Sequence, residues 1–115
     1  MPRGTKVGEG LYIGHFGGII ISGGVVIGRN CNISQGVTIG VAGRGDNRGI
    51  PVIGDCVYIG PGAKVVGKIR IGNNVAIGAN AVVTKDVPDS AVVGGVPVKI
   101  ISMNGSFEFI NNRCE

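Results

Sequence analysis

The sequence predicts an all-β protein built as a parallel β-helix, in which each short repeat forms one side of a coil. An aliphatic residue recurs every six positions along most of the chain. Glycine follows most of these residues directly, and a small or β-branched residue stands two places before most of them. A period of six matches neither an α-helix, with 3.6 residues per turn, nor a single strand, with two. Hexapeptide repeats are typical of β-helices, where stacked coils bury inward residues on each side.

The repeat predicts about four stacked coils. Three aliphatic positions make one coil, and coils stack at about 4.8 Å, so the whole stack measures about 19 Å. So short a stack exposes long apolar sides, which favours self-association. The aliphatic positions are Val7, Ile13, Ile19, Ile27, Ile33, Ile39, Ile53, Ile59, Val65, Ile71, Ile77 and Val83. The small or β-branched residues two places earlier are Val25, Cys31, Val37, Val57, Ala63, Val75 and Ala81.

Two steps of the repeat are irregular. The step from Ile19 to Ile27 is two residues longer than the period, and Ser22-Gly23-Gly24 is expected to widen that corner. The step from Ile39 to Ile53 is longer by eight, so residues 41–51 are expected to project as a loop. Insertions in repeat proteins gather on a binding face. The charged residues of this loop are therefore candidates for the wall of a binding site: Arg44, Asp46 and Arg48.

The repeat fades after Val83 into a turn-rich segment over residues 84–89. A last strand within residues 92–101, with Pro97 near its end, is expected to cap the open edge of the coil. We predict one domain over residues 1–101, with the loop inserted, and a C-terminal tail over residues 102–115.

Composition excludes several classes of protein. The net charge is +4, but the basic residues are scattered and aromatic residues make up only 4%, so no nucleic-acid surface is expected. No long apolar run or signal peptide is visible, which favours a cytoplasmic protein without a membrane segment. The three cysteines show no paired spacing. Cys31 is expected in the core, and Cys56 and Cys114 at the surface.

His15 is the only histidine and follows the repeat pair Ile13-Gly14, which places it at a corner. Histidine alone titrates near neutral pH without perturbation, so it can take a proton from a hydroxyl nucleophile. The alternative is a surface histidine that bonds a loop carbonyl.

Other kinds of catalytic site find little support. A zinc site like that of β-helical carbonic anhydrases needs three histidines, so no metal is expected. A serine–histidine–acid triad lacks a nucleophile elbow. An acyl-cysteine is disfavoured because Cys31 is expected to be buried and Cys56 has no histidine near it in the sequence.

Four segments together resemble the hexapeptide acyltransferases, and most of all the catalytic half of the bacterial serine acetyltransferases and their relatives in polysaccharide gene clusters. The resemblance covers residues 4–101 nearly without gaps, including the long step across the loop. The segments are Gly10-Leu-Tyr-Ile-Gly-His15-Phe-Gly-Gly18, Asn30-Cys-Asn-Ile-Ser-Gln-Gly-Val-Thr-Ile-Gly40, Ile53-Gly-Asp-Cys-Val-Tyr-Ile-Gly-Pro-Gly-Ala63 and Gly94-Gly-Val-Pro-Val-Lys99.

The resemblance implies a left-handed parallel β-helix that assembles as a homotrimer, with active sites between neighbouring subunits. It implies acetyl-CoA as a co-substrate and no permanently bound cofactor. His15 would deprotonate the hydroxyl of a small-molecule acceptor, which attacks the thioester directly, and backbone N–H groups would stabilise the oxyanion. Lys99 would meet a CoA phosphate. The pantetheine arm of CoA would lie along Gly40, Val41, Gly60, Pro61, Gly78 and Ala79.

The sequence departs from the serine acetyltransferase pattern around the acceptor. Gly14 stands where the family has an aspartate before the catalytic histidine. Gly49 and Ile50 stand where it has the Arg-His pair that holds the substrate carboxylate, and Arg48 is the nearest replacement. We predict an O-acetyltransferase that resembles serine acetyltransferase. The alternatives are a sugar or polysaccharide O-acetyltransferase, a non-catalytic truncated trimeric scaffold and a ligand-binding β-helix module.

Overall fold

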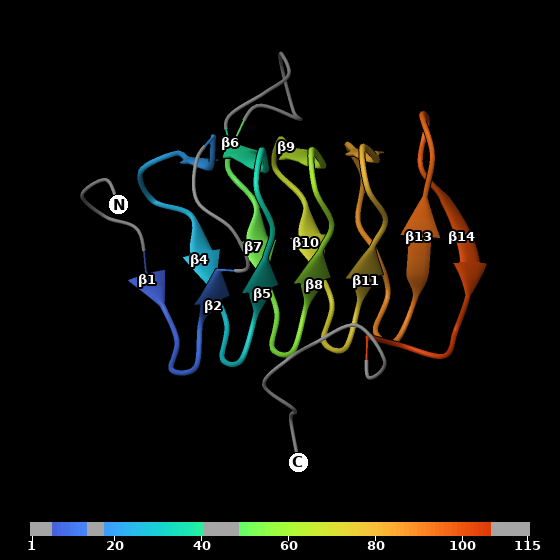
Figure 1. Cartoon of the computed structure of the whole chain (residues 1–115), viewed down its shortest axis with the longest axis horizontal. Helices are drawn as coiled ribbons and strands as arrows, with labels where there is room; N and C mark the ends of the chain where they lie inside the picture. Colours follow the sequence, from blue (N-terminus) through green and yellow to red (C-terminus); the bar gives the residue numbers. More distant parts are fainter. Residues whose placement is uncertain (1–5, 14–17, 41–48, 107–115) are drawn as a thin grey trace.

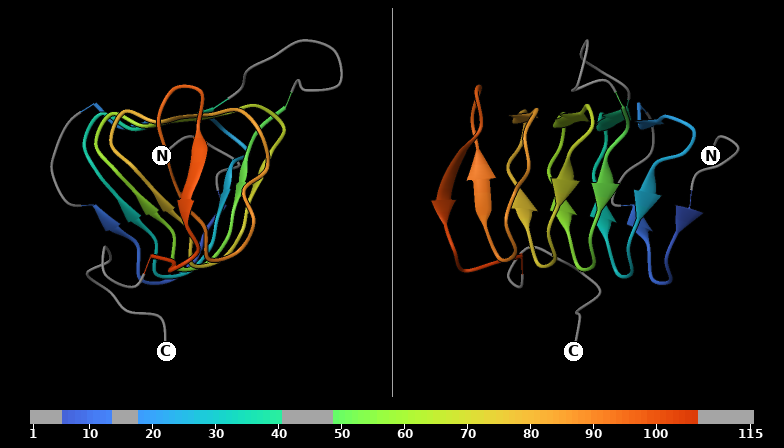
Figure 2. Two further views of the ribbon diagram at one scale, coloured as in Figure 1. Left: turned by 90° about the vertical axis from the view of Figure 1, so that its right-hand side faces the viewer. Right: turned by 180° about the vertical axis from the view of Figure 1, so that it is seen from behind.

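The computed structural model describes residues 6–13, 18–40 and 49–106, which form three narrow sheets wound around one axis (Figure 1). Up to β12, successive strands enter the three sheets in turn, so each full coil adds one strand to every sheet. Seen along the axis, the coil has three sides (Figure 2, left). The described part contains no helix, and therefore none that is long and apolar enough to cross a membrane. The predicted all-β architecture of parallel sheets is confirmed.

Most strands contain two residues, and neighbouring strands pair parallel except at the C-terminal end. Sheet A consists of β1 (Lys6–Val7), β4 (Val26–Ile27), β7 (Val52–Ile53) and β10 (Arg70–Ile71). Sheet B consists of β2 (Tyr12–Ile13), β5 (Asn32–Ile33), β8 (Tyr58–Ile59), β11 (Ala76–Ile77), β13 (Val92–Gly94) and β14 (Lys99–Ser102). Sheet C consists of β3 (Ile20–Ile21), β6 (Thr38–Gly40), β9 (Lys64–Val66) and β12 (Val82–Val83).

The interior is filled by the aliphatic residues of the six-residue repeat. Ile33, Ile59 and Ile77 lie in register on neighbouring strands of sheet B, and each side chain is at most 1% exposed. Side chains in such a column pack on those of the coils above and below, so the core is continuous along the axis. The residues two places earlier are buried as well: Val25, Cys31, Val37, Val57, Ala63, Val75 and Ala81.

The predicted inward residue is wrong at the first irregular step. Ile21, not Ile19, pairs in register with Ile39 and is 7% exposed, whereas Ile20 on the same strand is 61% exposed. A shift of one residue would turn every side chain of the strand to the other face. Three consecutive isoleucines, Ile19 to Ile21, look alike in a hydrophobic pattern, so the pairing with the next coil decides which one points inward.

This correction moves the two extra residues along the chain. Ile13 and Ile21 are eight residues apart, whereas their partners Ile33 and Ile39 are six apart. The widened corner is therefore the one between β2 and β3, which includes His15, and not Ser22-Gly23-Gly24. His15 and its neighbours, residues 14–17, lie outside the described residues.

The second irregular step is described only at its end. Residues 41–48 lie outside the described residues. Ile50 already packs against the core and Pro51 is buried, so the last residues of the predicted loop 41–51 belong to the coil.

The corner between sheets A and B, here called the AB corner, carries a ladder of side-chain hydrogen bonds. The N–H of Arg29 donates to Asp55 Oδ1 (2.8 Å), that of Asp55 to Asn73 Oδ1 (2.8 Å), and that of Asn73 to Asp89 Oδ1 (2.7 Å). Each carboxylate or amide oxygen satisfies a backbone donor of the preceding coil, which would otherwise have only water as a partner where the strand has ended.

Cys56 lies at the AB corner and is buried, at 1% exposure, so its predicted exposure is wrong. Residues 105 and 106 pack over this corner. Ser106 donates its N–H to the carbonyl of Asn74 (2.9 Å), and its hydroxyl bonds the carbonyl of Cys56. Gly105 and Ser106 are both buried. The rest of the predicted tail, with Cys114, lies outside the described residues, so the division at residue 101 stays a prediction.

The C-terminal end differs from the single capping strand that was predicted. β13 and β14 form an antiparallel hairpin, in which Gly94 lies opposite Lys99 and Val93 opposite Ile100. The turn between them contains a cis peptide bond before Pro97. The hairpin extends sheet B beyond the other two sheets (Figure 1).

Adjacent valines on β12 test the inward and outward assignment. Val83 is fully buried, whereas Val82 is partly exposed. We expect Val83→Ala to lower the free energy of unfolding by about 1–3 kcal/mol, because it removes two buried methyl groups and leaves a cavity. Val82→Ala should cost less than half as much. Chemical denaturation of both variants measures the difference, and equal losses would contradict the register of β12.

Candidate acyl-transfer site at the BC corner

The chain passes from sheet B to sheet C at a corner, here called the BC corner, that includes residues 34–37, 60–63 and 78–81. Gly60, Gly78 and Gly94 each follow directly on the inward residue of a sheet B strand. The N–H of Gly60 donates to the carbonyl of Ile77 (2.8 Å), and the N–H of Gly78 to that of Val93 (2.8 Å). The three glycines therefore form one column that runs parallel to the axis of the coil.

A second column, beside the glycines, ends in an exposed hydrogen-bond donor. Pro61 and Ala79 occupy the same place in successive coils, and the N–H of Asn80 donates to the carbonyl of Pro61 (2.8 Å). Pro61 has no N–H. The N–H of Ala79 donates to no acceptor within the described residues, and Ala79 is exposed. The corner therefore offers a narrow strip of small residues and a backbone donor for a ligand carbonyl.

The stacking of coils restricts Gly60 more than Gly78. A Cβ on Gly60 would lie 2.8 Å from the nitrogen of Ala79 and 2.9 Å from the carbonyl oxygen of Ile77, both in the backbone of the next coil. The nearest atom to a Cβ on Gly78 would be the carbonyl oxygen of Val93, at 3.3 Å. Packing against the next coil is thus enough to explain why residue 60 is a glycine. At position 78 packing is a weaker reason, so a role in ligand binding can add to it.

Lys99 continues the glycine column at its C-terminal end. Its Cα pairs in register with that of Gly94, and its side chain is exposed. It lines a shallow pocket of about 330 Å³ together with Lys85, Asp86 and apolar residues that include Val98 and Ile100. The structure therefore brings Gly60, Pro61, Gly78, Ala79 and Lys99 of the predicted CoA-binding set to one edge of the coil.

Gly40 is not at this edge. It lies at the far end of the sheet C strands, where β6 pairs with β9, and it is buried. Its carbonyl accepts the N–H of Gly67 (3.0 Å). The remaining predicted site residues lie outside the described residues: the catalytic His15, Val41 of the CoA-binding set, and Arg44, Asp46 and Arg48 of the acceptor set.

Sequence reasoning missed a polar side chain at the BC corner. Oε1 of Gln35 is buried and has no hydrogen-bond partner among the residues that the structure describes. The only hint in the sequence is the run Asn32-Ile33-Ser34-Gln35, which is more polar than the matching run Tyr58 to Pro61 of the next coil.

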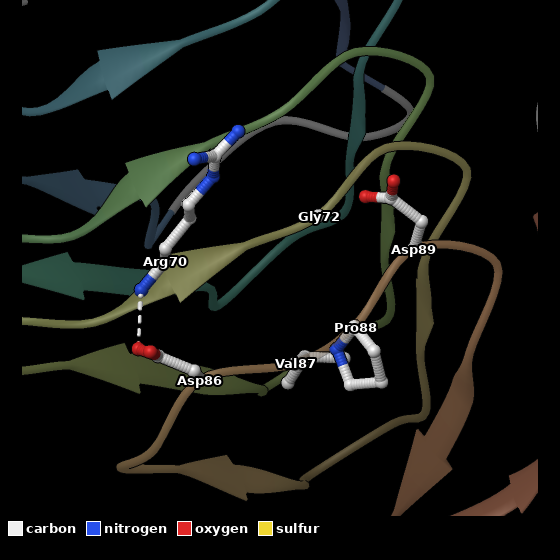
Figure 3. Close-up of a pocket in the computed structure, with 6 residues that line it drawn as sticks. All are labelled: Arg70, Gly72, Asp86, Val87, Pro88 and Asp89. Carbon is white, nitrogen blue, oxygen red and sulfur yellow. Dashed lines mark hydrogen bonds between the residues drawn. The ribbon is translucent and has the colours of Figure 1, made fainter.

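A second shallow pocket, of about 410 Å³, lies on sheet A and the segment after β12, away from the BC corner (Figure 3). The N–H of Arg70 donates to Asp86 Oδ1 (2.8 Å), while the guanidinium of Arg70 points away from that carboxylate. None of the predicted site residues lines this pocket.

The described cysteines offer no nucleophilic thiolate. Burial raises the pKa of the Cys31 thiol to about 11, so Cys31 stays protonated at neutral pH. Cys56 is held in a disulfide. Among the described residues there is also no group of three or more histidine, cysteine, aspartate or glutamate side chains that could hold a metal ion.

Comparisons with known proteins find similarity over the repeat region. Residues 50–85 match the family model of the bacterial transferase hexapeptide (six repeats). The serine acetyltransferase of Synechococcus elongatus is 41% identical over 102 residues, which are 89% of this chain and 42% of that protein. The serine acetyltransferase of Mycobacterium tuberculosis is 45% identical over 101 residues, which are 88% of this chain and 44% of that protein.

Solved structures of serine acetyltransferases are also similar to this chain. The serine acetyltransferase of Brucella abortus in complex with coenzyme A superposes with a TM-score of 0.82 at 37% identity, over 89% of this chain and 41% of that one. The enzyme of Neisseria gonorrhoeae in complex with serine gives a TM-score of 0.78 at 42% identity, over 86% and 40%. The predicted resemblance to serine acetyltransferases is confirmed. The chain spans less than half the length of the relatives that it matches.

The two column glycines provide a matched test of the BC corner. We expect Gly60→Ala to lower the melting temperature clearly, because its methyl group meets backbone that cannot move without displacing the next coil; overpacking of this kind costs about 1–3 kcal/mol. Gly78→Ala should melt close to the wild type. Thermal unfolding followed by circular dichroism measures both, and the reverse order would contradict the stacking of this corner.

Proposed function

We propose that this chain, which carries the hexapeptide repeat and resembles the serine acetyltransferases over nearly all of its described length, transfers the acetyl group of acetyl-CoA to the hydroxyl of a small acceptor, serine before others. The observation that carries the proposal is the continuous BC-corner column that ends at Lys99. The relatives in complex with coenzyme A and with serine support it.

The column suits an extended pantetheine arm. From the layer of β2 to that of β13 the coil rises four steps, about 19 Å at about 4.8 Å each. Gly60 and Gly78 let a ligand approach the backbone closely, and the N–H of Ala79 is free to bond an amide carbonyl of the arm. The thioester would then lie at the N-terminal coils and the nucleotide at the hairpin, beside the ammonium group of Lys99.

His15 acts as the general base in this proposal. The imidazole takes the proton of the acceptor hydroxyl while the oxygen attacks the thioester carbonyl. The tetrahedral oxyanion collapses to the ester, and the CoA sulfur leaves and takes up a proton. No acyl-enzyme is needed, in keeping with a protonated Cys31 and a disulfide-bonded Cys56.

The assembly is proposed to be a homotrimer of left-handed β-helices with sites between subunits. Gly40 lies at a different corner from Gly60 and Gly78, so one chain alone does not bring the whole CoA-binding set together. A neighbouring copy that presents its own Gly40 corner would complete the set. Exposed apolar side chains on the flat sides, such as Ile20 (61%) and Val52 (45%), support burial between copies. The cytoplasmic location stays a prediction.

A sugar hydroxyl is the second candidate acceptor, and one observation favours it. Ile50 stands at a position of the serine-binding Arg-His pair, and it packs against the core instead of carrying a charge. Arg44, Asp46 and Arg48 remain the proposed acceptor-binding residues, with Arg48 as the group whose planar fork suits a carboxylate.

A thiol-release assay tests the activity. Purified protein is mixed with acetyl-CoA and a panel of amino acids and sugars, and free CoA thiol is measured. We expect turnover with serine or a sugar, and His15→Ala should lower it by a factor of about 10² to 10⁴, the usual contribution of a general base. The variant should keep the CoA affinity and solution mass of the wild type. Wild-type turnover in His15→Ala would exclude His15 as the base.

Lys99 is tested by comparing two ligands. Lys99→Ala should weaken the binding of CoA more than that of dephospho-CoA, because a charge-assisted contact to the 3′-phosphate is lost. Lys6→Ala serves as the control. It removes an exposed lysine on β1, the first strand of sheet A, at the end of the coil opposite to β14. Calorimetry that finds both ligands equally weakened by Lys99→Ala would place this lysine away from that phosphate.

A further inference from the structure

Arg70 and Asp89 carry opposite charges on two sides of the shallow pocket on sheet A. The guanidinium of Arg70 and the carboxylate of Asp89 lie on either side of Gly72 (Figure 3). Neither group forms a salt bridge with another described residue, whereas Arg29 and Asp55 at the same AB corner do (3.7 Å). The pocket volume of about 410 Å³ is within the range of about 300–1,000 Å³ that is usual for small-molecule sites.

Backbone hydrogen bonds hold both charged residues in place. The N–H of Asn73 donates to Asp89 Oδ1 (2.7 Å), which leaves Oδ2 of the same carboxylate for a ligand. The N–H of Arg70 donates to Asp86 Oδ1 (2.8 Å). Gly72 is buried between them, and a Cβ at this position would clash with Asp89 Oδ1. The glycine therefore makes room for the carboxylate on the outer face of sheet A.

The repeat itself shows that the coil does not require this pair of charges. At three successive AB corners a side-chain oxygen lies over the glycine that follows a sheet A strand: Asp55 over Gly28, Asn73 over Gly54 and Asp89 over Gly72. The residues two places before these glycines are Val26, Val52 and Arg70. Among these corners, only the last one sets a cation on the sheet beside an acid. Stacking of coils explains the oxygen over the glycine, but it does not explain Arg70.

We propose that this pocket binds a free α-amino acid. The planar fork of Arg70 donates two parallel hydrogen bonds to the α-carboxylate, and Asp89 Oδ2 accepts one from the α-ammonium group. Arg70 and Gly72 are two residues apart on extended backbone, a rise of about 6.6 Å. A ligand whose two charges are close together therefore fits between the guanidinium and the carboxylate over Gly72.

The charges around the pocket favour a zwitterion over a simple ion. An anion without an ammonium group would meet the carboxylates of Asp86 and Asp89, and a cation without a carboxylate would meet the guanidinium of Arg70. Lys68 and Lys85 line the neighbouring pockets that also include Asp86, but they do not line this one. An α-amino acid satisfies both groups at once.

This site goes beyond the proposed transferase activity. Sheet B separates the pocket from the BC corner, so an amino acid bound here leaves the proposed CoA column open. The inference does not depend on acetyl transfer, and its test contains no acetyl-CoA.

L-Alanine is the probe, because it carries both charges and has no hydroxyl to act as an acceptor. We expect calorimetry on the full chain to detect its binding, and NMR to show shifts of the Gly72 amide and of the Arg70 Nε–H. Acetate and methylammonium, which each carry one of the two charges, should bind at least about tenfold more weakly. Arg70→Gln and Asp89→Asn should each raise the Kd for alanine at least about tenfold, because each removes one charge-assisted contact.

Asp55→Asn is the matched control, since it makes the same change at the same corner two coils earlier, and it should leave the Kd unchanged. Asp89→Asn keeps an amide oxygen for the N–H of Asn73, just as Asn73 supplies one to Asp55, so the corner should stay folded. Acetate that binds as tightly as alanine would overturn the proposal. So would a Kd that stays at the wild-type value in both Arg70→Gln and Asp89→Asn, since alanine would then bind elsewhere.

Discussion

The register between stacked coils is the constraint on which the rest of this structure depends. Each strand has only about two residues in which to pair, and its partners on both sides set which residue points inward. A coil with more residues than its neighbours cannot accommodate them within a side, because a slip by one would turn the apolar column outward. Extra residues are therefore displaced to the corners. For that reason the extra residues of both long steps are at corners, and both corners carry residues of the proposed site, His15 in the first and the acceptor-binding set in the second.

The period of six was enough to predict the all-β coil and nearly all of its inward residues. It failed at Ile19 to Ile21, because a pattern of hydrophobicity cannot choose among three identical residues and the pairing of Ile21 with Ile39 makes the choice. It failed also at Cys56, which is buried at a corner where the hydroxyl of Ser106, 50 positions later in the chain, bonds its carbonyl. Contacts of that kind leave no periodic trace.

The candidate site was predictable where it coincides with the repeat. Gly60, Pro61, Gly78 and Ala79 were assigned to the site by resemblance, and the stacking of coils explains why they lie together. Gly40 was expected in the same strip, but a glycine after an inward aliphatic residue occurs at every corner, so the sequence pattern does not tell one corner from another. Gln35 was missed for a different reason: whether an amide oxygen is satisfied depends on atoms of several coils, not on its spacing.

The ladder at the AB corner has a direction. Arg29 depends on Asp55, Asp55 on Asn73, and Asn73 on Asp89, so each coil relies on an acceptor that is synthesised after it. On a ribosome, a newly emerged coil therefore has a backbone donor that bonds only water until the following coil arrives. The hydrogen bonds of each AB corner are therefore complete only one coil after that corner is synthesised. Loss of Asp89 with the last coil would remove the acceptor of the Asn73 N–H. In this protein the C-terminal coils complete those made first.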